Sequence, residues 1–351
     1  MCADVLRPLL ALLLLGTVLV PQSEAQDREP AASAAAGTRD PGARTFEFGT
    51  TTRLPAGFAR AGEVELWIPV PVSNGYQDVA VLGWSAVDAV GAPVACGAAV
   101  ELAAEPASGN TLLHLRVPQG ESPELQVLAR YRVTRHAQRR DARPDGSGVE
   151  DPAARLLADR LVPLDGAIAE IAAQVSGEGE PCALGRALFE EVRARMTYDK
   201  VEPGWGLGDA LRACAVGKGN CTDFHALFMG LARARGVPAR FTIGLSLPEG
   251  PADGSALSGY HCWAEFLCAE HGWVPVDISE ADKAPERAED YFGRLTTNRV
   301  ALTSGRDLVL APAQHGGPVN FLVHPYAERG GAPLDAESTK AIEHVVSARD
   351  V

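Results

Sequence analysis

The chain has 351 residues, of which 46% are hydrophobic and 22% charged, and its 45 acidic and 32 basic side chains give a net charge of −13. This composition excludes a wholly disordered chain, and the length favours two domains over one. The acidic balance argues against a nucleic-acid partner or an anionic membrane surface, because both need a basic stripe that the sequence lacks.

The first 25 residues predict a cleaved signal peptide. Arg7 precedes an apolar run over residues 9–20 that is too short to span a bilayer, and a small-x-small cleavage site follows at Ser23-Glu24-Ala25. No other stretch is apolar for the roughly 18 residues that a spanning helix needs. We therefore expect an exported protein, periplasmic or secreted, without stable membrane insertion after cleavage. An uncleaved N-terminal anchor is the alternative.

Residues 26–44 are rich in Ala, Pro, Arg and Gly without periodicity, which predicts a disordered linker. Over residues 45–140, apolar side chains alternate with polar ones, the period of β-strands. The clearest runs are residues 64–68, 113–117 and 125–133, and clusters of turn residues separate them. This pattern predicts a small β-sandwich domain that carries no catalytic constellation and serves packing or substrate recognition.

A charged stretch over residues 135–150 marks a domain boundary, after which the period becomes helical. Helices are expected between residues 156 and 196 and over residues 222–235, the last ending before Gly236 and Pro238. Strand-like runs follow at residues 240–247, 261–268 and 273–277. Helices followed by antiparallel strands predict an α+β catalytic domain over residues 151–330. The C-terminal tail, residues 331–351, has only weak helical spacing.

Cys221 lies at the first turn of the helix over residues 222–235. Asn220 is a good N-cap, and Asp223 completes a pattern close to a capping box. The helix dipole and unpaired backbone N–H groups stabilise a thiolate at this position, and the N–H of Cys221 can face an oxyanion. Cys221 is therefore the predicted nucleophile, and a structural buried cysteine is the alternative.

A thiolate needs a base, and the base needs an acceptor that orients it. If the strands over residues 261–268 and 273–277 pair as an antiparallel hairpin, His261 and Asp277 meet at one edge of the sheet. Alone, His261 would more often be a capping or surface residue and Asp277 a turn residue. Their joint placement with Cys221 predicts a Cys-His-Asp triad.

Four segments together resemble a transglutaminase-like domain: residues 219–228 (GNCTDFHALF), 235–240 (RGVPAR), 261–265 (HCWAE) and 272–277 (GWVPVD). They follow the order of the family and cover about residues 151–277. Residues 67–71 (WIPVP) resemble the β-domain that precedes such cores in exported bacterial members, and residues 290–326 resemble the strands that close them. The resemblance implies a papain-like core with Cys221 as nucleophile, His261 as general base and acid, and Asp277 as the residue that orients it.

In this family an aromatic side chain can supplement the oxyanion hole, and Trp205, between two glycines, is the nearest candidate. Packing of Trp205 over the preceding helix is an equal alternative. His225, one helical turn after Cys221, could serve as another base. A role in supporting the site or in packing is the better expectation for His225, because its ring would project back along the helix toward the cap rather than across a cleft.

We expect no metal and no cofactor. Cys262, Cys268 and His271, together with His261 and Glu265, could supply zinc ligands, but their spacing is not a usual zinc pattern, and dependence on Ca²⁺ stays open. Cys262 and Cys268 share a strand face but lie too far apart to bond to each other. If a disulfide forms, the pairing to test first is Cys182 with Cys214, both in the helical part.

These features predict an exported thiol enzyme that acts on a protein or peptide, or another amide, through a thioester on Cys221. Hydrolysis would make it a cysteine peptidase or amidase, and attack by an amine would make it a cross-linking enzyme; the triad does not choose between them. The alternative is a catalytically silent scaffold protein of the cell envelope. The sequence does not fix the oligomeric state.

Overall fold

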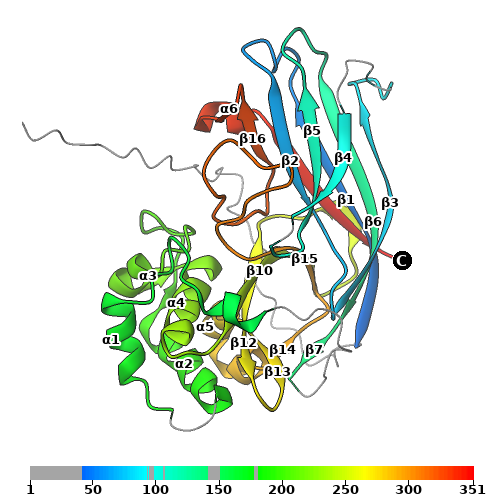
Figure 1. Ribbon diagram of the computed structural model, residues 1–351. Helices are drawn as coiled ribbons and strands as arrows, with labels where there is room; N and C mark the ends of the chain where they lie inside the picture. The colour runs from blue at the N-terminus through cyan, green and yellow to red at the C-terminus, as the bar shows by residue number, and fades with distance from the viewer. Residues whose placement is uncertain (1–41, 93, 95–98, 106, 141–150, 178–180) are drawn as a thin grey trace, which may run out of the picture.

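The computed structural model describes residues 42–351, apart from residues 93, 95–98, 106, 141–150 and 178–180 (Figure 1). The predicted signal peptide and nearly all of the predicted linker lie outside the described residues. The α+β prediction is confirmed: helices pack on an antiparallel sheet, and a β-sandwich lies beside them (Figure 1). No helix among the described residues is long and apolar enough to cross a membrane.

Two five-stranded sheets form the sandwich. The first has the order β11 (Asp253–Ala256), β18 (Glu343–Asp350), β1 (Ala43–Leu54), β6 (Leu125–His136) and β3 (Gln77–Val87). The second has the order β17 (Ala332–Pro333), β16 (Tyr326–Arg329), β2 (Val64–Val70), β5 (Thr111–Val117) and β4 (Ala99–Ala104). Alternate apolar residues of β1 and β6 face the apolar residues of β2 and β5, and together they form the interior of the sandwich.

The C-terminal segment differs from the expectation of a weakly helical tail. Residues 336–340 do form a short helix, α6 (Ala336–Lys340), but β18 follows it and pairs with β1 along eight residues (Figure 1). Tyr326, expected within the strands that close the catalytic core, starts β16 and pairs with β2 instead. The sandwich is thus built from both ends of the chain, with most of the core inserted between them.

Strand β2 is buried on both faces, although the alternation in its sequence predicts one exposed face. Trp67, on the expected outer face, packs in a cluster with Leu308, Leu310 and Leu322, and its indole N–H donates to the carbonyl of Pro312 at 2.8 Å. The segment between β15 and β16 supplies these partners. Local periodicity could not indicate that a distant segment covers the sheet.

The core sheet has the order β13 (Gly272–Val276), β12 (His261–Cys268), β10 (Ala239–Ser246) and β15 (Arg299–Ser304). Helices α1 (Gly166–Gln174), α2 (Pro181–Arg195), α3 (Ala210–Val216) and α5 (Ile278–Lys283) surround the central helix α4 (Cys221–Ala234), which packs on β10 and β12. Every residue of α4 from Cys221 to Arg233 is buried. The remaining elements are β7 (Gln138–Arg139), β8 (Thr197–Tyr198), β9 (Lys218–Gly219), β14 (Arg294–Leu295) and the 3₁₀ helices Pro152–Leu156 and Pro285–Tyr291.

Two amide side chains of the sandwich dock onto the outer edge of the core sheet. Gln77 accepts a hydrogen bond from the N–H of Ala301 at 2.9 Å and donates to its carbonyl at 3.0 Å. Asn110 makes the same pair of bonds with Ser304, at 2.7 and 2.8 Å. The sandwich therefore satisfies the polar backbone groups that β15 would otherwise leave unpaired at the edge.

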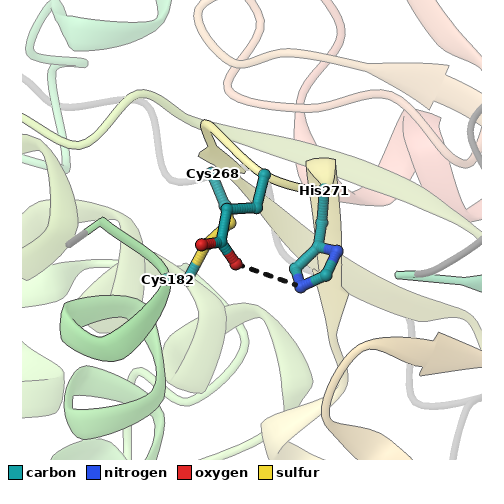
Figure 2. Close-up of a disulfide and its surroundings, with 4 residues drawn as sticks. Cys182, Cys268 and His271 are labelled. Carbon is teal, nitrogen blue, oxygen red and sulfur yellow. Dashed lines mark ion pairs between the residues drawn. A yellow bond between two sulfur atoms is a disulfide. The ribbon is translucent and has the colours of Figure 1, made fainter.

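The disulfide joins Cys182 to Cys268, so the expected pairing of Cys182 with Cys214 is wrong (Figure 2). Cys182 lies in the first turn of α2 and Cys268 ends β12, and these two elements pack together with the two Cα atoms 5.0 Å apart. Cys214 lies in α3 as a free, half-buried thiol. Packing of a helix on a distant strand decides the pairing, which proximity along the chain does not reveal.

Candidate active site

Cys221 is the first residue of α4, and local chemistry fixes this start. The Asn220 side chain accepts a hydrogen bond from the N–H of Thr222 at 3.0 Å, and Asp223 accepts one from the N–H of Asn220 at 3.0 Å, which confirms the capping box. Gly219 precedes the cap, and a Cβ atom there would collide with the Asp223 side chain. The helix start is therefore rigid, and the thiol is held at the positive end of the dipole.

His261 and Asp277 meet as the strand pairing predicts. His261 opens β12, and the ladder between β12 and β13 ends at Ala264 and Val276, so that Asp277 leaves the sheet and caps α5. The Nε2–H of His261 donates to Asp277 Oδ2 at 2.7 Å, and both residues are buried. Since Asp277 occupies Nε2, Nδ1 is the ring nitrogen left for Cys221, with which His261 forms a hydrogen bond.

Asp277 has further donors that orient its carboxylate. Arg299, on β15, donates to Oδ2 at 3.1 Å, while Ser279 and the N–H of Glu280 donate to Oδ1 at 3.3 and 3.4 Å. The Arg299 guanidinium also lies over the ring of Trp263, 5.1 Å from its centroid. Both carboxylate oxygens are thereby held, and the side chain presents Oδ2 to His261.

The electrostatics favour an ion pair between Cys221 and His261. Burial raises the pKa of the Cys221 thiol, but hydrogen bonds with Cys262 and His261 outweigh burial and lower the pKa to about 6. Burial lowers the pKa of His261, but the charge and hydrogen bond of Asp277 raise it to about 10. Burial raises the pKa of Asp277, while His261 and Arg299 hold it well below its usual range. The thiolate and the imidazolium therefore coexist near neutral pH.

Trp205 lies in the loop that precedes α3, and its side chain is half-buried. The loop is tied to the start of α4, because the N–H groups of Gly206 and Gly208 donate to the two oxygens of Asp223 at 2.7 and 3.0 Å. Lys200 lies 5.9 Å from the centre of the Trp205 ring. The loop therefore carries Trp205 to the end of α4 that bears Cys221.

His225 is fully buried, and its Nε2 accepts a hydrogen bond from the N–H of Ile278 at 3.1 Å. Its contacts and its burial fit a role in packing or in supporting the site. The rival zinc set is not brought together, since Cys268 ends β12 in a disulfide while His261 begins it. Among the described residues, no group of three or more His, Cys, Asp or Glu side chains has an arrangement suited to a metal ion.

Sequence reasoning missed three side chains of this site. Arg299 lies 22 residues from Asp277 in the chain and only the pairing of β15 with β10 brings it close. Tyr260 accepts a hydrogen bond from the Asn220 side chain at 2.7 Å. Its position just before His261 is the one sequence signal that could have indicated a place near the site. Cys262 was considered only as a zinc ligand or a disulfide partner, and it lies against Cys221.

Comparison with known families agrees with this geometry. Residues 169–278 match the transglutaminase-like superfamily, and this stretch contains Cys221, His261 and Asp277. The chain carries a transglutaminase-like domain. An uncharacterized protein of Haemophilus influenzae is 28% identical over 341 residues, which cover 86% of this chain and 90% of that protein. The similarity to this relative therefore extends beyond the transglutaminase-like domain into the sandwich.

Among solved structures, a candidate cysteine protease from Cytophaga hutchinsonii is 14% identical, with coverage of 88% of this chain and 98% of that one and a TM-score of 0.51. At this identity the similarity shows a shared fold. The periplasmic domain of TgpA from Pseudomonas aeruginosa, bound to ethylmercury, is 19% identical over 70% of this chain and 93% of that one, with a TM-score of 0.34.

Proposed function

We propose that this protein is an exported thiol enzyme that transfers an acyl group from a peptide or another amide through a thioester on Cys221. One observation carries the proposal: Cys221 starts a capped helix in hydrogen-bond contact with His261, whose other ring nitrogen donates to Asp277 at 2.7 Å. This is the order nucleophile, base and orienting acid that thiol acyl transfer requires.

In the first half of the reaction, the Cys221 thiolate attacks the amide carbonyl carbon. His261 then donates its Nδ1 proton to the leaving nitrogen, so that the C–N bond breaks and a thioester remains. In the second half, neutral His261 removes a proton from water or from an amine, which attacks the thioester and releases Cys221. Asp277 holds the ring in place and stabilises the imidazolium throughout.

The oxyanion would be stabilised at the start of α4. Because Cys221 is the first residue of the helix, its N–H has no partner inside the helix. This N–H lies at the positive end of the helix dipole. The indole N–H of Trp205 is our candidate for the second donor. Its support is the loop anchored on Asp223, which lies against the same helix end.

The disulfide between Cys182 and Cys268 supports export, because such bonds persist in oxidising compartments. A periplasmic or secreted location also agrees with the signal peptide predicted over residues 1–25.

A thiol-directed peptide probe tests the proposal, followed by mass spectrometry of peptide mixtures incubated with and without a primary amine. We expect labelling and turnover in the wild type and in Cys214→Ala, and their loss in Cys221→Ala and His261→Ala. Cleavage or loss of ammonia would identify a hydrolase, and amine addition a cross-linking enzyme. Equal labelling of wild type and Cys221→Ala, without turnover, would instead favour the silent scaffold.

A further inference from the structure

His225 has a fixed tautomer, which sets the direction of the hydrogen bonds behind the nucleophile. Its Nε2 lies 3.1 Å from the backbone nitrogen of Ile278, and an amide N–H can only donate. Nε2 therefore carries no proton. Burial lowers the pKa of His225 to about 4, so the ring is neutral at physiological pH and its single proton is on Nδ1.

The protonated Nδ1 of His225 lies 3.4 Å from the sulfur of Cys262. Because Nδ1 carries the proton, the sulfur is an acceptor here, and the backbone of Cys221 is a second hydrogen-bond partner of the same ring. Burial raises the pKa of the Cys262 thiol well above its usual value, so that this residue keeps its own proton. The hydrogen bond between Cys262 and Cys221 lowers the pKa of Cys221 and raises that of Cys262, which is the pattern expected when the Cys262 thiol donates to the Cys221 thiolate.

Several charged and titratable groups face these two sulfur atoms from the surrounding elements. Those that act on Cys221 are His261 of β12 and Lys283 of α5, with the neutral phenol of Tyr260 nearby. Those that act on Cys262 are Asp277 and Arg306. Cys262 and His261, which follow one another on β12, are hydrogen-bond partners that lower the pKa of Cys221.

We propose that Cys262 is a positioning residue for the nucleophile: its S–H, oriented by the Nδ1–H of His225, donates a hydrogen bond to the Cys221 thiolate. This inference rests on the proposed function, in which the thiolate is the attacking group. His261 supplies the proton that the reaction uses, whereas Cys262 keeps its proton and holds the thiolate in place before substrate binds. Ordered donors of this kind reduce the reorganisation that a reaction must otherwise achieve.

The pH dependence of alkylation by iodoacetamide tests this inference without a substrate. The rate is read at Cys221 alone, by mass spectrometry of its peptide, in the full chain and in Cys262→Ala, Cys262→Val and Cys262→Ser. Cys214→Ala is the matched control, since this free thiol lies outside the site. Loss of the hydrogen bond that the weak S–H donor makes to the charged thiolate should raise the pKa of Cys221 by about one unit. The fraction of thiolate at low pH, and with it the alkylation rate, should then fall about tenfold.

We expect this shift in Cys262→Ala and Cys262→Val, and a curve close to wild type in Cys262→Ser, whose hydroxyl can also donate. The two apolar variants differ in volume, so the alkylation rate can still be measured in one of them if the other fails to fold. Curves that superimpose on wild type in both apolar variants would overturn the proposal, as would an equal shift in Cys262→Ser. A protein that shows the shift but turns over no amide would contradict the proposed function and leave the hydrogen bond standing.

Discussion

Arg299 and His261 donate to the same oxygen of Asp277, at 3.1 and 2.7 Å. Arg299 belongs to β15, the edge strand that Gln77 and Asn110 of the sandwich hold. A continuous set of contacts therefore runs from the sandwich through β15 to the carboxylate that orients His261. In this arrangement the sandwich contributes to the rigidity of the candidate active site, beyond any role in binding substrate.

Replacing Arg299 by methionine should lower kcat by up to about 100-fold with little change in KM, because a slight misplacement of Asp277 misorients His261 while the substrate surface is unchanged. Steady-state kinetics on a peptide identified by the turnover screen would measure both constants. Arg287→Met is the matched control, since Arg287 forms an exposed ion pair with Asp290 at 3.3 Å. A rise in KM with kcat preserved would argue against an orienting role for Arg299.

The rate of the first chemical step should follow a bell-shaped pH profile. Activity should rise through the pKa of Cys221, about 6, as the thiolate forms, and fall through the pKa of His261, about 10, as the imidazolium loses the proton needed by the leaving group. Measurement of kcat/KM from pH 4 to 11 in a constant-ionic-strength buffer would test both limbs. A profile that rises only above about pH 8 would mean that Cys221 behaves as an ordinary thiol.

Gln77→Leu should destabilise the fold, because it leaves the buried N–H and carbonyl of Ala301 without partners. Each unsatisfied group costs about 1–3 kcal/mol. Urea unfolding monitored by tryptophan fluorescence would report the change. The exposed residue Gln119 gives the control, and we expect Gln119→Leu to change stability by less than about 0.5 kcal/mol. Equal midpoints for the two variants would show that the edge of β15 does not need this amide.

Loss of the disulfide should also destabilise the protein. Cys182 and Cys268 lie 86 residues apart, and removing a native disulfide typically costs about 2–5 kcal/mol. Thermal unfolding of Cys268→Ser, compared with Cys214→Ser as control, would measure the loss. Peptide mapping without reduction should recover residues 182 and 268 in one linked fragment. Recovery of Cys214 in that fragment would contradict the pairing.

Local signals were sufficient for the elements that carry the chemistry. Asn220 and Asp223 cap α4 through side chains within three residues of one another, so a short sequence fixes the start of the helix and the position of Cys221. β12 begins at His261 and ends at Cys268 as the strand-like run predicted, and its hairpin with β13 delivers Asp277. In these cases the partners are neighbours along the chain or are joined by a tight turn.

Features that depend on distant packing could not be predicted. The disulfide partner of Cys182 follows from the packing of α2 on β12, and the burial of Trp67 depends on a segment more than 200 residues later. Arg299 reaches Asp277 only because β15 joins β10. Each of these contacts joins two segments whose own sequences are compatible with many neighbours.

Pairing of β1 with β18 also constrains how the chain reaches its final structure. Phe46 lies opposite Asp350, so the first described strand and the last one close the same sheet across nearly the whole chain (Figure 1). Contacts of such large sequence separation slow folding, because a long loop must close before they form. During synthesis β1 therefore cannot complete its pairing until the eight residues of β18 have been made. Before that point β1 can pair with β6 on one side only. A chain that stops before β18 would leave β1 as an open edge, prone to pair with another molecule.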